Sequence, residues 1–154
     1  MSAKDARLQK NANAQGIVIK VQHHRNNGGE SISSAMLPGD SDAETWRDAI
    51  MKDYDRSELS SDIMMAAHHG SDSFFEHPSY KNDFEEHMKA IKPGMTVVSV
   101  GKNSHGHPDA KALRLYEKHS AGSKQGNKVF RTDKKGSMIL TLHDEGGWNL
   151  KTDR

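Results

Sequence analysis

The sequence predicts a layered α/β domain, and two observations support this prediction. Apolar segments with the β-branched composition of strands alternate with segments whose apolar residues recur at helical spacing. Polar clusters rich in histidine, glycine and aspartate follow three of the predicted strands. Because ligands of α/β sheets bind in the crevice beyond the carboxyl ends of the strands, these clusters form the candidate site.

Strand signals dominate the first forty residues. Residues 1–15 are polar without periodicity and are interpreted as a disordered leader, so the domain is expected to span residues 16–154. Residues 16–22 are rich in β-branched side chains and predict a strand. Residues 32–37 predict a second strand, after a hairpin turn expected in the Asn- and Gly-rich residues 23–30.

The middle of the chain alternates between helix and strand. A helix is expected over residues 42–54, because Ser41 or Asp42 can cap it and apolar side chains then share one face. Buried strands are expected over residues 62–67 and 95–100. A helix is expected between them, over residues 81–91.

The last third predicts one helix and two or three strands. The helix is expected to begin with Pro108 at its first position and to point Leu113 and Tyr116 inward. Strands are expected over residues 128–131, 137–142 and 148–150, with a turn at residues 133–136.

The three polar clusters supply the candidate site residues. They contain Asp40, the pair His68 and His69, and the pair His105 and His107. Imidazoles and a carboxylate in one crevice suit zinc, or manganese with more oxygen ligands. Each cluster also has a structural interpretation: Asp40 as a turn residue, one histidine of the first pair in packing, and His107 at a helix start.

Composition excludes several classes of protein. Lys and Arg number 22 against 21 for Asp and Glu, so a net charge of +1 gives no strong field for nucleic acid or anionic lipid. No apolar run reaches the ~18–20 residues of a membrane span. The absence of cysteine excludes disulfides, thiolate metal ligands and a thiol nucleophile. We therefore expect a soluble, cytoplasmic protein without a membrane partner.

Four segments follow one another in an informative order: LPGDSDAETW, SSDIMMAAHHGSDS, IKPGMTVVSVGKNSHGHPDAKALRLYEKH and VFRTDKKGSMILTL. Their order resembles the metallo-β-lactamase fold, in the branch of the hydrolase domain of ComEC-type competence DNA-uptake proteins. The resemblance covers roughly residues 16–142, and four motifs in order are more specific than any one. It implies that the chain is the C-terminal half of an αββα sandwich, a mixed β-sheet flanked by helices.

The resemblance also implies roles for single residues. Asp40 matches a carboxylate that bridges two metal ions, and His107 matches a Gly-His-Pro histidine that is a ligand or a phosphate contact. His68 or His69 is expected beside the metal or the attacking water, with His68 assigned as a ligand and His69, like Asp40, as catalytic. Substrate contacts are expected from Ser71, Lys102, Asn103 and His105.

One motif of the family is missing. The His-x-His-x-Asp-His motif belongs to the first half of the fold, and no histidine lies in the residues before the first matching strand. The sequence HGHPDA at residues 105–110 imitates it, but it lies after the other motifs and has Ala110 in place of the last histidine. A half-domain would expose its inner sheet face. The chain is then a fragment, pairs with a separate N-terminal half, or forms a homodimer through that face. The sequence is compatible with all three.

The implied activity is metal-dependent hydrolysis by two divalent ions, zinc or manganese, that lower the pKa of a bridging water toward about 7. For this branch the resemblance implies hydrolysis of phosphodiesters such as single-stranded nucleic acid, and other members of the superfamily cleave esters, amides or thioesters. Three other interpretations stay open: a non-catalytic half-domain that binds a partner, an inactive remnant, and a His-rich module that takes up metal without turnover.

Overall fold

One mixed five-stranded sheet organises the chain, which a computed structural model describes over residues 16–25, 29, 31–77, 79–122 and 128–154. The predicted leader, residues 1–15, lies outside the described residues. The first strand pairs antiparallel with the second, and the other three continue in parallel, which confirms the α/β prediction. In sheet order the strands are β1 (Ile19–His24), β2 (Ser31–Leu37), β3 (Ile63–Met65), β4 (Met95–Val98) and β5 (Val129–Arg131).

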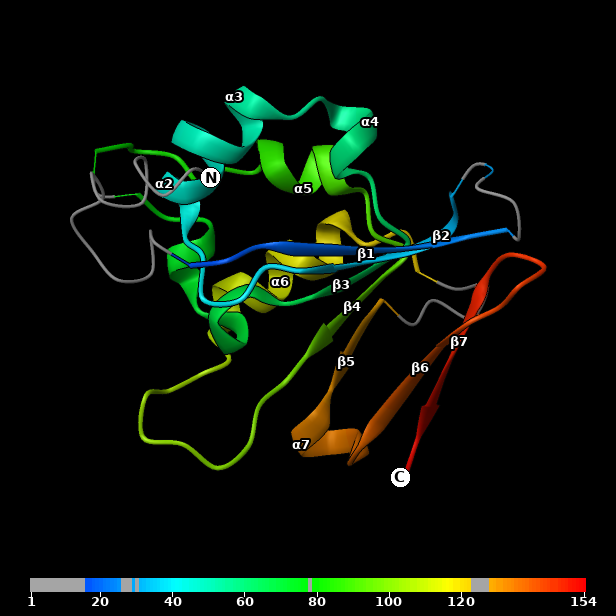
Figure 1. The fold of residues 1–154 in the computed structure, drawn as a ribbon. Coiled ribbons are helices and arrows are strands. Elements are labelled where there is room, and N and C mark those ends of the chain that lie inside the picture. The colour runs from blue at the N-terminus through cyan, green and yellow to red at the C-terminus, as the bar shows by residue number, and fades with distance from the viewer. Residues whose placement is uncertain (1–15, 26–28, 30, 78, 123–127) are drawn as a thin grey trace.

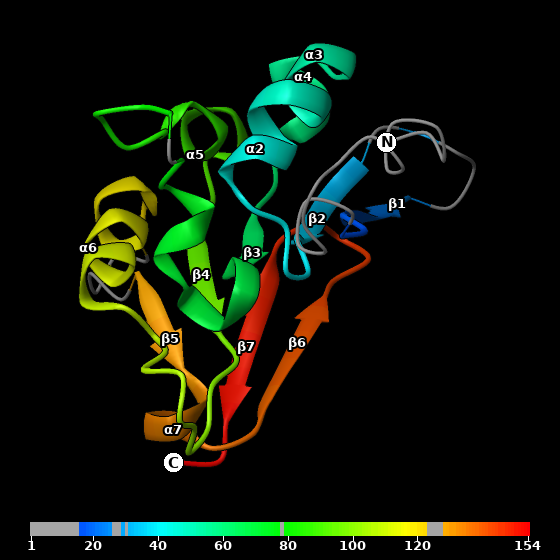
Figure 2. The same cartoon turned by 90° about the vertical axis from the view of Figure 1, so that its left-hand side faces the viewer.

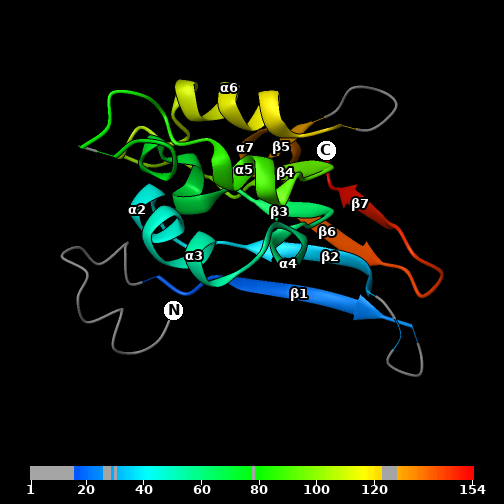
Figure 3. The same cartoon turned by 90° about the horizontal axis from the view of Figure 1, so that it is seen from above.

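Helices cover one face of this sheet, and a second small sheet lies against the other (Figures 1 and 2). The covering elements are α2 (Ala43–Thr45), the π-helical turn η2 (Trp46–Ile50), α3 (Met51–Asp53), α4 (Arg56–Leu59), the 3-10 turns η3 (Ala67–Gly70) and η4 (Asp72–Phe74), α5 (Glu86–Ile91) and α6 (Ala110–His119). After β5, the single turn α7 (Thr132–Lys135) leads into the antiparallel hairpin of β6 (Met138–Leu142) and β7 (Trp148–Thr152). Figure 3 shows the five strands side by side beneath the helices.

Capping bonds explain where two predicted helices begin. The Asp42 carboxylate accepts the Thr45 backbone N–H at 2.9 Å, so the helix predicted over residues 42–54 starts as expected, although its middle winds as the π-turn η2. The helix predicted from Pro108 instead begins at Ala110. Asp109 is its N-cap, since the carboxylate of Asp109 accepts backbone N–H groups from the first turn.

Two other predictions differ from the structure for local reasons. The helix predicted over residues 81–91 is reduced to α5, because the Phe84 N–H donates to the Phe75 carbonyl at 2.7 Å and Lys111 holds the Asp83 carboxylate at 2.6 Å. These bonds fix residues 83 and 84 in the preceding connection. The turn predicted at residues 133–136 is the helical turn α7, and β1 includes His23 and His24, which were expected in the turn.

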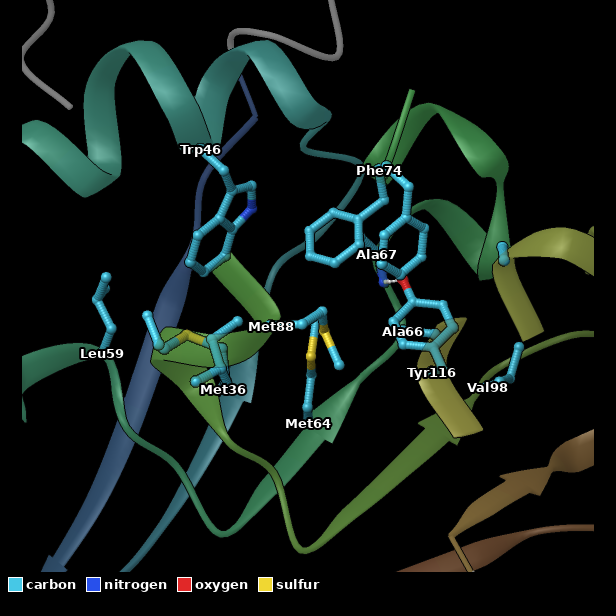
Figure 4. Packing of buried hydrophobic residues seen from close by; sticks show 14 of the residues in the cluster. Met36, Trp46, Leu59, Met64, Ala66, Ala67, Phe74, Met88, Val98 and Tyr116 are labelled. Carbon is cyan, nitrogen blue, oxygen red and sulfur yellow. Dashed lines mark hydrogen bonds between the residues drawn. The ribbon is translucent and has the colours of Figure 1, made fainter. Parts of the chain in front are cut away.

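The main core lies between the sheet and the helices (Figure 4). Met36 and Met64 project from neighbouring strands against Trp46 and Phe74, all four completely or almost completely buried. The buried hydroxyl of Tyr116 accepts the Ala67 backbone N–H at 3.1 Å, and burial raises the pKa of that phenol. Helix α6 is thereby fastened to the chain directly after β3, where the first histidine pair lies.

The opposite face of the sheet is only partly covered. A small cluster of Ala35, Ile63 and Met95 packs against half-buried apolar residues that include the hairpin side chains Leu140, Trp148 and Leu150. Beyond this cluster, Ile19 in β1 remains 50% exposed and Met65 in β3 39% exposed. Exposed apolar patches of this kind mark surfaces that bind another chain or segment more often than chance.

No helix in the described ranges is long and apolar enough to cross a membrane.

A histidine occupies the centre of the aromatic core. His87 in α5 is completely buried, and its Nε2–H donates to the Phe74 carbonyl at 2.9 Å. The rings of Phe74, Phe84 and Phe75 lie 4.1, 4.9 and 5.4 Å from the imidazole, centroid to centroid. Burial lowers the pKa of His87 to about 3, because the apolar surroundings disfavour the imidazolium.

We expect this histidine to make the fold acid-sensitive. Since the His87 pKa is lower in the folded chain than in the unfolded chain, the unfolded state binds more protons below pH 6.5, and the free energy of unfolding falls with pH down to about 3. The loss approaches about 1.4 kcal/mol per pH unit. In His87→Phe, urea unfolding at pH 4–7 should show a shallower pH dependence than wild type. The exposed-site control His143→Gln should keep the wild-type slope, and an unchanged slope in His87→Phe would contradict the assignment.

Candidate active site

The structure gathers the predicted clusters at one edge of the sheet. Strands β2 to β5 are parallel, so the segments that follow them emerge at the same edge. The Gly39 carbonyl, beside Asp40, accepts the His68 N–H at 2.9 Å, and the Gly70 carbonyl accepts the Asp109 N–H at 2.9 Å. These two bonds join the segment after β2 to the histidine pair, and the pair to the Gly-His-Pro segment.

The histidine pair has an unusual backbone. His68 and His69 both adopt left-handed conformations, with φ angles of 46° and 56°, which cost side-chain-bearing residues about 1–3 kcal/mol each. The turn sends the two imidazoles to different partners. Nδ1 of His68 lies 3.2 Å from the Ser73 hydroxyl, and Nδ1 of His69 lies 2.8 Å from the carbonyl of Ser99, directly after β4.

Gly70 allows the pair to approach the Gly-His-Pro segment. Its φ is +84°, and a Cβ at this position would lie 2.7 Å from Cβ of Pro108 and 3.2 Å from Cγ1 of Val98. Neither the conformation nor the space admits a side chain. The close approach brings the rings of His68 and His107 to a centroid distance of 5.4 Å.

A cleft of about 580 Å³ opens where these segments meet. Three imidazoles line it, from His69, His105 and His107, together with the backbone after β4 and Thr132 after β5. Figure 2 shows the loop after β4 lying beside α7, and residues of both segments line the cleft. The sequence interpretation missed Thr132, although it lies in the Arg-Thr-Asp segment. Its hydroxyl binds both the N–H and the carbonyl of Val100, at 2.7 Å each, and so fixes the cleft wall.

Hydrogen bonding defines the protonation of His69. A carbonyl oxygen only accepts hydrogen bonds, so the His69 Nδ1 facing Ser99 carries the proton. In the neutral ring Nε2 then keeps its lone pair, which is the form that binds a metal ion or takes a proton from water. The side chain of His69 is exposed and lines the cleft.

Electrostatics keep the neighbouring histidine neutral. Burial is the largest cause that lowers the pKa of His107, followed by the positive charges that His68, His105 and His69 would carry. Asp72 opposes them more weakly. The imidazole of His107 is therefore available as a base or ligand near neutral pH.

The remaining predicted site residues lie around the cleft in different ways. Asp40 is exposed and, within the described ranges, makes no side-chain hydrogen bond or ion pair. Ser71 is 5% exposed and is the N-cap of η4. Its hydroxyl accepts hydrogen bonds from the backbone N–H and the hydroxyl of Ser73. Lys102 is exposed on the loop between two residues that line the cleft. The Asn103 carboxamide bonds within its own loop.

The arrangement does not make a metal site by itself. In the part of the chain that the structure describes, no three histidine, aspartate or glutamate side chains lie where they could hold a metal ion together. A zinc site needs at least three protein ligands. The predicted set of Asp40, His68 and His107 is thus not assembled here, and His69 with His107 supplies part of a site at most.

Comparisons with family models, with curated proteins and with solved structures return no match. The interpretation of the cleft therefore depends on the residues and distances given above.

We expect Gly70→Ala to destabilise the fold by about 1–3 kcal/mol, because the left-handed backbone and the contact with Pro108 both exclude a methyl group. Urea denaturation measures the change. Gly101→Ala is the matched control, since a Cβ at Gly101 meets nothing within 4 Å and should leave the midpoint nearly unchanged. Equal midpoints for the two variants would contradict the close approach.

The His107 ring should titrate below the ordinary histidine pKa of about 6.5, as followed by the imidazole proton signals in a pH series. Substituting His68→Ala should raise the His107 pKa, because it removes a neighbouring positive charge and some of the burial. His24→Ala, on β1, is the control and should leave it unchanged. A His107 pKa at or above 6.5 in the wild type would refute the described environment.

Proposed function

We propose that this chain forms one wall of the active site of a metallo-β-lactamase-like hydrolase that cleaves phosphodiesters, with the remaining metal ligands supplied by a second half. One observation carries the proposal: two segments almost forty residues apart, His-His-Gly-Ser and Gly-His-Pro, converge on one cleft at the carboxyl edge of a parallel sheet. Loops at such an edge are where α/β proteins place catalytic groups.

The strained turn supports a functional interpretation of the cleft. Two consecutive non-glycine residues in left-handed backbone persist only where surrounding bonds enforce them, and such residues concentrate at active sites. Here the carbonyl of Gly39 accepts the His68 N–H, and the carbonyl of Ser99 accepts the His69 Nδ1–H. These two hydrogen bonds hold the histidine pair in place. Glycine at these two positions would adopt the same backbone without this cost.

In the proposed reaction His69 acts as the general base. Its ring lines the cleft, and the bond from Nδ1–H to the Ser99 carbonyl fixes the ring and leaves Nε2 as the nitrogen that can take a proton. His107, neutral because its pKa is lowered, lies on the same wall and can accept a hydrogen bond or a metal ion. The ammonium group of Lys102, on the same loop, suits an anionic substrate such as a phosphodiester.

The uncovered sheet face supports the idea of a missing half. An apolar row crosses the sheet from Ile19 through Leu37 and Met65 to Val97, with its members exposed or half-buried. A second sheet packed on this row would bury it, as in sandwich folds where inner faces meet about 10 Å apart. Because the described residues hold no complete metal site, the divalent ions of the proposed enzyme need ligands from that second half.

The uncovered face also favours a second candidate, a non-catalytic half-domain that works by binding a partner. Such a module would use the apolar row and would have no need of His69 or His107. The two candidates differ in what Zn²⁺ does to the cleft histidines.

A zinc titration with a hydrolysis assay tests the proposal. We expect Zn²⁺ to shift the ring signals of His69 and His107 in NMR spectra at micromolar or higher concentration, because a partial set of ligands binds more weakly than a complete site. With Zn²⁺ in excess, slow hydrolysis of bis(4-nitrophenyl) phosphate should follow. His69→Ala should lower this rate about a hundredfold or more, the range for loss of a general base.

The control is His143→Ala, at an exposed histidine next to the β6–β7 turn, which should change neither the zinc response nor the rate. Absence of a zinc response at His69 and His107 would overturn the proposal in favour of the partner-binding module. A zinc response without His69-dependent hydrolysis would overturn the enzyme and leave a metal-binding module.

A further inference from the structure

We infer that Asn103 is a positioning residue of the proposed site: its carboxamide fixes the loop over residues 101–107 so that the imidazoles of His105 and His107 line the cleft. The hydrogen bonds of Asn103 show how the loop is held, and the proposed function supplies the reason why the loop must be held. It replaces the expectation that Asn103 contacts substrate.

All hydrogen-bonding capacity of the Asn103 side chain is used inside the loop. Its Oδ1 accepts the backbone N–H groups of His105 and His107 at 3.0 and 3.2 Å. Its Nδ2 donates to the carbonyls of Gly101 and His107 at 3.0 and 2.8 Å. A carboxamide has two acceptor positions and two donor hydrogens, so none is left for a substrate.

The four bonds act on the backbone that carries the cleft histidines. Asn103 binds both the N–H and the carbonyl of His107, which fixes the peptide groups on either side of that residue. The loop itself has no helix or strand from residue 99 to residue 109. Its internal order therefore depends on this one side chain, because backbone groups without such a partner would bind water instead.

The loop is held at both ends by other residues, which isolates the contribution of Asn103. At the start, the Thr132 hydroxyl holds the N–H and carbonyl of Val100. At the end, the Asp109 N–H donates to the Gly70 carbonyl. A substitution at Asn103 should consequently loosen residues 101–107 while leaving the sheet and α6 intact.

Three variants test the inference in the complete chain by NMR. Asn103→Ala removes all four bonds, Asn103→Asp keeps an acceptor for the two N–H groups, and Asn149→Ala on β7 is an exposed control. The readouts are solvent exchange of the His105 and His107 amides, the proximity signal between the His68 and His107 rings, and the Zn²⁺ concentration that half-shifts the His107 ring. Amides of α6 report whether the fold is intact.

We expect Asn103→Ala to raise exchange of the two amides at least about tenfold, to weaken the His68–His107 signal, and to raise the zinc midpoint about tenfold, the lower end of what loss of an outer-shell partner costs. Asn103→Asp should retain slow exchange of both amides, and Asn149→Ala should match wild type.

Wild-type exchange and zinc midpoint in Asn103→Ala would overturn the inference. If that variant lost the protection of α6 as well, Asn103→Asp would decide: slow exchange of the two amides supports the inference, and fast exchange with α6 protected overturns it. Failure of the proposed function gives a different pattern, since wild type would then lack a zinc response while Asn103→Ala still accelerated exchange.

Discussion

The contact between Gly70 and Pro108 is the constraint on which the rest of the cleft depends. It lets the turn after β3 and the loop after β4 meet without side chains between them, and the Asp109 N–H closes the gap by bonding to the Gly70 carbonyl. A side chain at residue 70 would separate the two segments and, with them, His68 from His107. The position of an apparently minor glycine thus determines which imidazoles share one wall.

The hydrogen bonds around this contact offset the strain that it creates. Left-handed backbone at His68 and His69 is unfavourable by itself, but the His68 N–H, the His69 ring and the neighbouring Ala67 N–H each find an acceptor on a different element: Gly39, Ser99 and Tyr116. Because those acceptors lie after β2, directly after β4 and in α6, the turn is stable only in the assembled fold. Its geometry is therefore a tertiary property and not a local one.

This dependence explains what the sequence could and could not predict. Hydrophobic patterning located every strand and the helices at residues 42 and 110 to within a few residues, because their apolar faces are encoded locally. Motif order singled out the histidines and Asn103, and the resemblance implied a substrate contact for Asn103. The positioning role that we infer for Asn103 instead follows from four hydrogen bonds to the backbone, which only coordinates reveal. The same holds for Thr132, which follows β5 and whose hydroxyl accepts the Val100 N–H from the segment after the neighbouring strand β4.

The partner half proposed above would explain two features of the chain. The sheet face opposite the helices carries an apolar row that its own hairpin covers only in part, and the cleft at the edge of that sheet presents imidazoles without a complete ligand set among the described residues. An exposed apolar sheet face and an incomplete set of metal ligands need not occur in the same protein. One further layer on the open face would bury the apolar row, and its loops, emerging at the same edge, would reach the cleft. A single partner of this kind accounts for both, whereas a purely adhesive role for the face leaves the ordered histidines unexplained.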